Sequence, residues 1–202
     1  MSNATPPPLP KLSVAAQQAA TPEAKLVTIS GMIGPVKRPH DFGFKQGDCH
    51  LIMNDRAESL AAWSFDGERL WCIPAMARGQ GRDTDWKNRG TDTPPGIYRL
   101  GQLYDDVGRV GLTPSYTKTF LEYGWQFYDM VELENQEARW GRAGIGLQGG
   151  GTALGWPGAW APKQGLVPTL RCIRIANIDL VEKIMPLYKK GTCFISVFQE
   201  AP

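Results

Sequence analysis

The sequence predicts a mainly β (β-rich α+β) domain with one short helix near its C-terminal end. Short apolar runs separated by Gly, Pro and Asp are typical of strands joined by turns, and they fill most of the chain from residue 26 onward. One late stretch, 177–190, instead carries apolar residues at helical spacing. With 202 residues, 42% of them hydrophobic, the chain can bury a core of its own.

The N-terminal segment differs in composition from everything that follows. Residues 1–25 are rich in Pro, Ala, Gln and Thr and contain few large apolar groups. Such a composition predicts an extended or disordered arm, because too little apolar surface is available to offset the entropy of ordering. We therefore expect an arm at 1–25 and a folded domain at 26–202. A disordered tail is favoured over a segment that docks on a neighbouring subunit.

Three apolar runs near the start of the domain predict a β-meander. They are CHLIMND (49–55), SLAAWSF (59–65) and RLWCIPAM (69–76), and Asp66-Gly67 between the last two is a tight hairpin signal. A further strand is expected after two prolines, from Gly96.

The second half of the domain gives a mixed pattern. The stretch 119–135 suits a helix by spacing and strands by its aromatic content, and both readings stay open. A strand running into a glycine-rich loop is predicted at 142–155. The helix at 177–190 has Asn177 as its expected N-cap, and Pro186 is expected to kink or shorten it. An alternating strand closes the chain at 192–198.

Composition and missing motifs exclude several classes of protein. The 22 basic residues nearly balance the 20 acidic ones, so nucleic acid is not an expected partner. The four cysteines lack C-x-x-C spacing and the chain has only two histidines, so no metal site is expected. The sequence also lacks a phosphate-loop, an H-E-x-x-H and a G-x-S-x-G motif, so we expect neither a cofactor nor a common hydrolase. We expect Cys49, Cys72 and Cys193 to be reduced core thiols. The sequence contains no run of ~20 apolar residues, so no membrane-spanning segment is predicted.

The order of motifs resembles a known family. The matching residues fall in three groups: Thr93, Pro94, Gly96 and Tyr98; Cys172, Ile173, Arg174, Asn177 and Asp179; and Gly191, Thr192, Ile195 and Val197. Over residues 48–199 the chain is similar to the L,D-transpeptidase catalytic domain of the YkuD type. The resemblance implies a β-sandwich with a short helix after the cysteine motif, a site on peptidoglycan stem peptides, and Cys172 as the nucleophile of that site.

The chain departs from the family pattern at both motif histidines. Gln148 stands in Leu147-Gln148-Gly149, where the family has I-H-G, and Leu170 stands in Thr169-Leu170-Arg171-Cys172, where the family has S-H-G-C. Glutamine can hydrogen-bond but cannot exchange a proton with the thiol or the leaving amine. General acid–base assistance is typically worth roughly 10²–10⁴-fold, so ordinary turnover is not expected.

Two functions follow from this combination. The first is a non-catalytic pseudoenzyme that recognises peptidoglycan or serves as a structural component, in which Cys172 is a retained core thiol. The alternative is an active Cys172-dependent L,D-transpeptidase or L,D-carboxypeptidase acting on peptidoglycan stem peptides. The first is favoured because both histidines are replaced.

Five further residues are candidates for binding. Gln148 could hold a substrate amide or satisfy neighbouring backbone, and Arg171 and Arg174 could hold stem-peptide carboxylates, although bracing of the site is favoured for Arg174. Trp156 and Trp160, in a proline-rich insert, could stack on sugar rings, but packing over the cleft is the favoured reading.

The cellular context is a further expectation. The N-terminus lacks a basic leader followed by an apolar region, so we expect synthesis in the cytoplasm without a signal peptide. Since peptidoglycan lies outside the membrane, the protein would reach it in a phage virion or by delivery to the periplasm. The arm would then contact phage tail or virion subunits.

Overall fold

The computed structural model describes residues 26–81, 86–88, 90–110, 118–141, 143–151 and 158–200. The predicted arm at 1–25 and Trp156 lie outside this part, so the domain boundary stays a prediction. Among the described residues, no helix has the length and apolar character needed to cross a bilayer.

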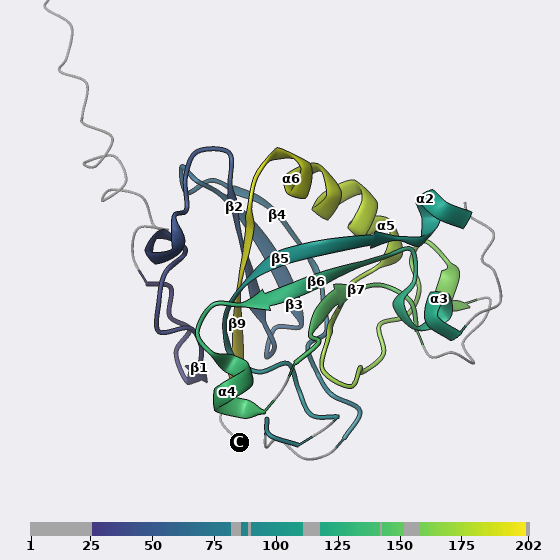
Figure 1. Cartoon of the computed structure of the whole chain (residues 1–202), viewed down its shortest axis with the longest axis horizontal. Helices are drawn as coiled ribbons and strands as arrows, with labels where there is room; N and C mark the ends of the chain where they lie inside the picture. The colour runs from purple at the N-terminus through teal and green to yellow at the C-terminus, as the bar shows by residue number, and fades with distance from the viewer. Residues whose placement is uncertain are drawn as a thin grey trace, which may run out of the picture.

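In the described part of the chain, one mixed sheet of nine strands forms the body of the protein (Figure 1). The strands are β1 (Met32–Ile33), β2 (Cys49–Asn54), β3 (Ser59–Ser64), β4 (Arg69–Pro74), β5 (Gly96–Asp105), β6 (Gln126–Glu132), β7 (Gly146–Gln148), β8 (Ile173–Arg174) and β9 (Cys193–Glu200). Their order is β4-β3-β2-β9-β5-β6-β7-β8, and β1 pairs with β9. The β2–β9 and β7–β8 pairs are parallel and the others are antiparallel.

The helical elements are short and lie at the ends of strands. They are η2 (Pro39–Phe42), α2 (Asp106–Val110), α3 (Lys118–Tyr123), α4 (Gln136–Trp140), η3 (Gly158–Trp160), α5 (Asn177–Asp179), η4 (Leu180–Ile184) and α6 (Met185–Lys190).

The sheet curls so that its two halves face each other. In Figure 1, strands β2, β3 and β4 run steeply across β5 and β6, and the main core lies between these halves. Core side chains come from both of them, including Leu51, Leu60, Tyr128 and Leu147. The predicted mainly β fold is thereby confirmed, and the two layers expected of a sandwich come from one continuous sheet.

Strands that were predicted from local pattern are found where they were expected. The meander is β2, β3 and β4, with Gly67 at φ 79° in the hairpin turn. The stretch 119–135, for which helix and strand were both left open, contains one of each: the helix α3 is followed by the strand β6. Gly124 separates them because a Cβ there would lie 2.1 Å from the Asn177 Oδ1 atom, a distance at which only glycine fits.

The C-terminal helix runs continuously from residue 177 to 190 as α5, η4 and α6. Asn177 is not its N-cap; Ala176 occupies that position, and the Asn177 side chain bonds to distant backbone instead. Pro186 does not end the helix. The segment η4, directly before it, is a π-helical turn, and the helix continues through Pro186 into α6.

Candidate functional site

A tight turn at residues 169–172 presents Cys172. The Thr169 hydroxyl oxygen accepts hydrogen bonds from the backbone N–H groups of Arg171 (3.1 Å) and Cys172 (2.7 Å), and the hydroxyl donates to the Cys172 carbonyl at 2.7 Å. A threonine can fill both roles because its oxygen accepts while its hydrogen donates. The residue that begins the cysteine motif therefore fixes the backbone around the thiol.

Thr93 braces the same turn from the other side. Its side chain is fully buried, and its hydroxyl lies 3.1 Å from the Arg171 carbonyl and 3.3 Å from the Ala77 carbonyl, to which it can donate in turn. Thr93 thus joins the segment before β5 to the cysteine turn. This contact gives a physical reason for a threonine in the T-P-P-G stretch.

The structure brings four of the predicted residues together. Cys172, Gln148, Arg171 and Arg174 line one hollow of about 240 Å³, which we call the inner hollow. Its remaining walls are Gln80, Glu122, Tyr123, Phe127, Gly144, Gly151, Thr169 and Leu170. Cys172 is only 7% exposed, yet it lines this hollow and is not sealed in the core.

Sequence reasoning missed the wall made by Glu122, Tyr123 and Phe127. These residues come from α3 and β6, the stretch that pattern alone left open between helix and strand. The only signal for them was the unusual aromatic content of 119–135.

Gln148 and Arg174 are neighbours in the sheet. They lie opposite each other in the parallel pair of β7 and β8, which places both side chains at the inner hollow. Gln148 is 3% exposed, and its Oε1 atom has no hydrogen-bond partner among the described residues. A buried amide without a partner costs free energy, so this glutamine is not accounted for by packing alone.

Arg174 is a buried cation with incomplete pairing. It is 3% exposed, and among the described residues its guanidinium has one hydrogen-bond partner, the Glu122 carbonyl, at 3.4 Å from Nη2. Its Nε and Nη1 atoms have no partner in this part of the chain. Burial lowers the pKa of Arg174 to about 10, an effect that Cys172 and Glu122 oppose. The group therefore stays protonated at neutral pH. The bracing predicted for Arg174 amounts to this one long contact.

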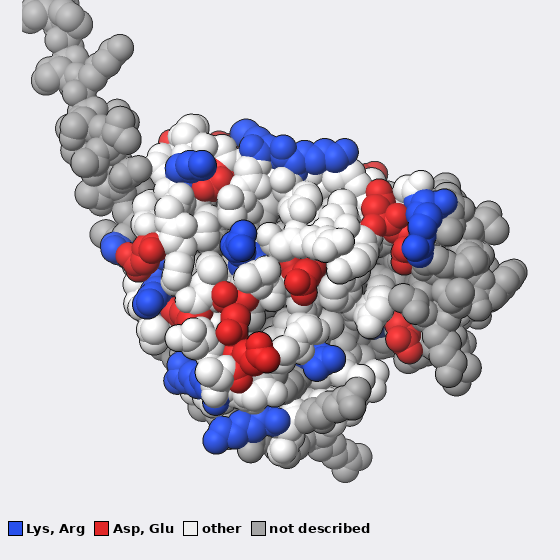
Figure 2. Space-filling model, viewed as in Figure 1, with Lys and Arg blue, Asp and Glu red and all other residues white. Residues whose placement is uncertain are grey.

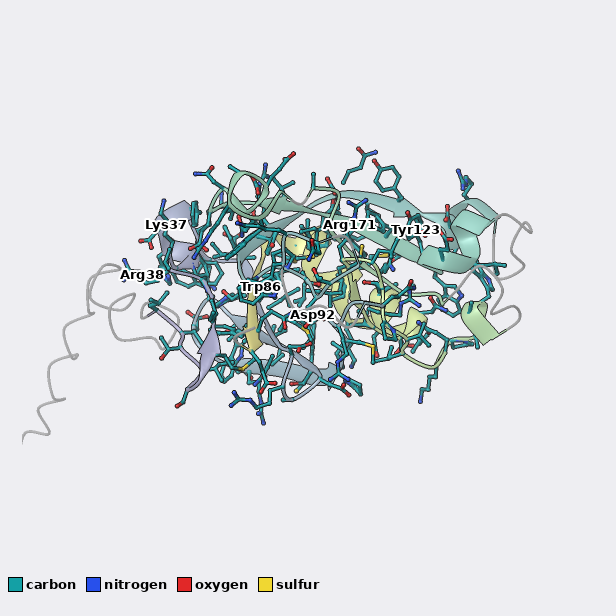
Figure 3. The ribbon with its side chains drawn as sticks, turned by 90° about the horizontal axis from the view of Figure 1, so that it is seen from below. Lys37, Arg38, Trp86, Asp92, Tyr123 and Arg171 are labelled. Carbon is teal, nitrogen blue, oxygen red and sulfur yellow. The ribbon has the colours of Figure 1, made fainter. Side chains whose placement is uncertain are left out.

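Arg171 sits at the rim of the inner hollow, close to Tyr123 (Figure 3). Its guanidinium makes no ion pair with any described carboxylate. Burial raises the pKa of Tyr123, and the positive charge of Arg171 acts in the opposite direction. Tyr123 is therefore a neutral hydrogen-bonding group near pH 7 and not a general base.

A second hollow, of about 630 Å³, adjoins the first; we call it the outer hollow. The two share Tyr123, Phe127, Gly144 and Arg171 as walls. Three aromatic rings line it in a row, with Phe127 packed 4.9 Å from Tyr123 and 6.0 Å from Tyr104 between ring centroids. Its other walls are Asp105, Asp106, Arg109 and Asp129. Acidic and basic groups lie side by side at its α2 end, where Arg109 pairs with Asp106 (Figure 2).

Both histidines of the chain lie away from these hollows. His50 is buried on β2, with its Nε2 atom 2.7 Å from the Ser196 hydroxyl oxygen, and burial lowers its pKa to about 3. His40 lies in η2 and packs against Phe44, with ring centroids 5.1 Å apart. Neither lines the hollow at Cys172, so no imidazole of this chain stands beside the thiol.

The remaining candidates do not join the site. Trp160 is buried against Trp125, whose Nε1 donates to the Trp160 carbonyl at 2.9 Å, so the ring of Trp160 offers no open face for a sugar. Cys49 and Cys193 are buried opposite each other on β2 and β9, as expected for core thiols. Cys72 was expected in the core as well, but it is exposed, because it lies on the face of β4 opposite to the buried Ile73.

Comparison with known proteins gives structural matches alone. No protein-family model and no curated protein matches the sequence. The helical cell shape determining protein Pgp2 from Campylobacter jejuni superposes with a TM-score of 0.51 at 16% identity, over 77% of this chain and 49% of that one. The chain shares the Pgp2 fold. At this identity the match shows a distant fold relationship and no activity.

Two other solved structures are similar at lower TM-scores. Bd1075 from Bdellovibrio bacteriovorus matches at 18% identity over 73% of this chain and 46% of its own, with a TM-score of 0.49. An L,D-transpeptidase (Yku) from Stackebrandtia nassauensis matches at 13% identity over 93% of this chain and 65% of its own, with a TM-score of 0.43. The chain thus spans about half the length of Pgp2 and Bd1075.

Proposed function

We propose that this protein binds peptidoglycan stem peptides in the inner hollow without turning them over. The observation that carries the proposal is the composition of that hollow: Cys172 is there, while both histidines of the chain lie elsewhere. Gln148 lies opposite Arg174 in the sheet and stands where the similar family has a histidine. A glutamine side chain cannot exchange protons.

The inner hollow is built to bind even without a base. Two guanidinium groups and one buried glutamine side chain line the same small space, and three of their buried atoms, Nε and Nη1 of Arg174 and Oε1 of Gln148, have no partner in the described residues. Concave sites with a few convergent polar groups are the usual form of a ligand pocket. The shared fold with Pgp2, described as a cell-shape protein, supports a ligand from the cell wall.

The alternative proposal is a Cys172-dependent L,D-transpeptidase or L,D-carboxypeptidase. The position of Cys172 in the wall of a hollow favours it over a purely structural thiol. In this case Glu122, on the same wall, is the available carboxyl group for proton transfer.

One experiment separates these two functions. The purified protein and its Cys172→Ala variant are incubated with muropeptides that carry tetrapeptide stems, and the products are resolved by mass spectrometry. We expect no Cys172-dependent cleavage or exchange. Product formed by the wild type and lost in the variant would establish the enzyme instead.

Binding is tested by sedimentation with insoluble peptidoglycan. We expect the wild type to be retained and free muropeptides to release it. If the protein stays in the supernatant at all concentrations of peptidoglycan, the recognition proposal is wrong.

Assembly into a phage tail or virion is a separate proposal. It rests on the composition of residues 1–25, which suits an arm that orders on a neighbouring subunit. Deletion of 1–25 should abolish co-purification with tail or virion subunits encoded beside this gene while leaving the domain folded. Neighbouring genes without such subunits would contradict it.

A further inference from the structure

The outer hollow is one part of a longer groove along β6. A third hollow, of about 200 Å³, adjoins it and shares Asp129 and Gly144 as walls. The outer hollow reaches α2, and the third hollow reaches Glu137 on α4. These two helices lie at opposite ends of β6 (Figure 1). We call the outer and third hollows together the β6 groove; it passes the inner hollow, with which the outer hollow shares four of its walls.

Aromatic rings form one wall of the β6 groove. Tyr104 and Phe127 lie opposite each other in the antiparallel pair of β5 and β6, so their side chains leave the same face of the sheet. Tyr104 is 51% exposed. The Phe127 ring is held against β7, where a Cβ at Gly146 would lie 2.2 Å from it. An exposed tyrosine ring beside a fixed phenylalanine ring offers a ligand apolar surface that the core of the protein does not use.

The charged groups of the outer hollow are mixed in sign. Asp105, Asp106 and Asp129 face Arg109 and Arg171, so the charges nearly balance, and a strongly charged ligand such as a phosphate is not favoured. The Asp129 carboxylate makes no ion pair with a described residue. Carboxylates accept hydrogen bonds and guanidinium groups donate them. The walls therefore suit a neutral ligand that carries many hydroxyl groups.

We propose that the β6 groove binds a neutral saccharide chain, with one pyranose ring stacked on Tyr104 and hydroxyl groups donating to Asp129. A pyranose ring has an apolar face of C–H groups and a rim of hydroxyl groups, which matches an aromatic wall beside carboxylates. The outer hollow, of about 630 Å³, has the size of pockets that hold drug-sized ligands, and a disaccharide of N-acetylhexosamines is such a ligand.

The junction of the hollows suits a branched ligand. Gly144 lines all three of them. It has a φ of 66°, and a Cβ at this position would lie 3.6 Å from a guanidinium nitrogen of Arg171, so a glycine keeps the junction open. A saccharide chain in the β6 groove passes this point, where a peptide attached to it can enter the inner hollow. The inference thus rests on the proposed function, which names the stem peptide alone, and adds the glycan strand as a second recognised part.

Titration with a saccharide that carries no peptide tests the inference. The β-1,4-linked trimer of N-acetylglucosamine is added to the full-length protein, and binding is followed by NMR. We expect saturable shifts of the backbone amide signals of Tyr104, Phe127 and Asp129, and none with trilysine at the same concentrations. Absence of saturable shifts up to the solubility limit of the trimer would overturn the inference. Equal or larger shifts with trilysine would also overturn it, because the groove would then bind cations.

Two substitutions of Tyr104 test the stacking contact. Tyr104→Phe keeps the ring and should keep the affinity for the trimer within about twofold, whereas Tyr104→Leu keeps apolar bulk without a ring and should lower it by about tenfold. Because Tyr104 is half exposed, both variants should remain folded, which circular dichroism checks. Equal affinities of the two variants would show that no sugar ring stacks on Tyr104.

Asp129→Asn tests the polar contact. It should weaken binding of the trimer several-fold, because an amide oxygen accepts more weakly than a carboxylate. Asp66→Asn is the matched control: it makes the same change of charge at an exposed residue of the β3–β4 turn, outside all three hollows, and should leave the affinity unchanged. Equal losses of affinity in the two variants would show that net charge alone is responsible, and the assignment of Asp129 would be wrong.

A parallel titration with a free tetrapeptide stem separates this inference from the proposed function. Binding of the stem without binding of the trimer leaves the function standing and removes the saccharide site. Binding of the trimer in the β6 groove without binding of the stem has the opposite meaning. If neither probe binds, the function and the inference are both wrong.

Discussion

Two buried polar groups, Asn177 and Arg174, lie three positions apart in the chain and are treated in opposite ways. The Asn177 side chain accepts from the N–H groups of Trp125 and Gly150 and donates to the carbonyls of Ala159 and Ala161, at 2.7–3.2 Å. Arg174 has one long hydrogen bond and two nitrogens without a described partner.

The hydrogen bonding of these two residues assigns them different roles within one short motif: Asn177 stabilises the fold, and Arg174 belongs to the candidate binding site. Asn177 uses all of its hydrogen-bonding capacity to tie three segments, at Trp125, at Gly150 and at 159–161, to the helix, which is the arrangement expected of a group that stabilises the fold. Arg174 and Gln148 line the inner hollow, and each has buried polar atoms without a partner among the described residues. Groups that weaken the unliganded protein in this way are typical of binding sites.

The largest expected effect is at Asn177. Asn177→Leu leaves two buried N–H groups and two carbonyls without partners, and we expect the free energy of unfolding to fall by about 4 kcal/mol. Urea denaturation followed by circular dichroism measures it. Asn54→Ala is the control, because Asn54 makes a single exposed bond to the Ala57 N–H, and it should cost about 1 kcal/mol or less. Equal losses of unfolding free energy in the two variants would contradict the role of Asn177 in joining these segments to the helix.

Local pattern explains why this role was missed. The sequence predicted Asn177 as an N-cap, a role decided within one turn of helix, whereas its real partners are 16 to 52 positions away. The meander of β2, β3 and β4 and the closing strand β9 were predictable because alternation and turn residues are local signals. The inner hollow was anticipated through the ordered motifs. The outer hollow depends on how β5 and β6 pair, which no local signal contains.

The second largest effect is a change of stability with pH, caused by His50, which is buried far from both hollows. His50 has a folded pKa of about 3 against an ordinary value of 6.5, because burial disfavours its charged form. Since the pKa is depressed on folding, His50 binds its proton mainly in the unfolded state, and stability is lost as the pH falls below 6.5. We expect its contribution to fall by about 2 kcal/mol between pH 7 and pH 5.

Asp55 acts against His50 in the same pH range. Burial raises its pKa to about 6, and Asp92 adds to the shift. A carboxyl with a raised pKa contributes stability that is lost as the pH rises through 6, so Asp55 partly masks the effect of His50. On going from pH 7 to pH 5, the urea midpoint should therefore fall further in Asp55→Asn than in the wild type, and it should rise in His50→Asn, where Asp55 alone titrates. The same pH dependence in all three proteins would refute the assignment.

Replacement of Arg174 is expected to change the free energy of unfolding less than replacement of Asn177, and in the opposite direction. Because its charge is buried and incompletely paired, Arg174→Met should leave stability unchanged or raise it by about 1 kcal/mol, whereas retention on insoluble peptidoglycan should be lost. Thermal denaturation and sedimentation of one preparation give both values. A fall in stability as large as that of Asn177→Leu would show that Arg174 is a structural group, and the contrast between the two residues would disappear.

The smallest change in stability is expected at Gln148, where the comparison can be made sharpest. Leucine has a similar size and removes an Oε1 atom that no described residue satisfies, so Gln148→Leu should alter the free energy of unfolding by less than about 1 kcal/mol. Retention on insoluble peptidoglycan should weaken, because the inner hollow loses one of its polar walls.

Gln126→Leu serves as the matched control for this last change. Gln126 is equally buried, but it donates to Asp105 and accepts from the Tyr128 hydroxyl, so its replacement should cost about 2 kcal/mol. A buried glutamine whose bonds are made would then stabilise the fold, and one whose bonds are held open would serve a ligand. If Gln148→Leu destabilises the protein as much as Gln126→Leu does, Gln148 is a structural residue and is not one of the groups that bind a ligand in the inner hollow.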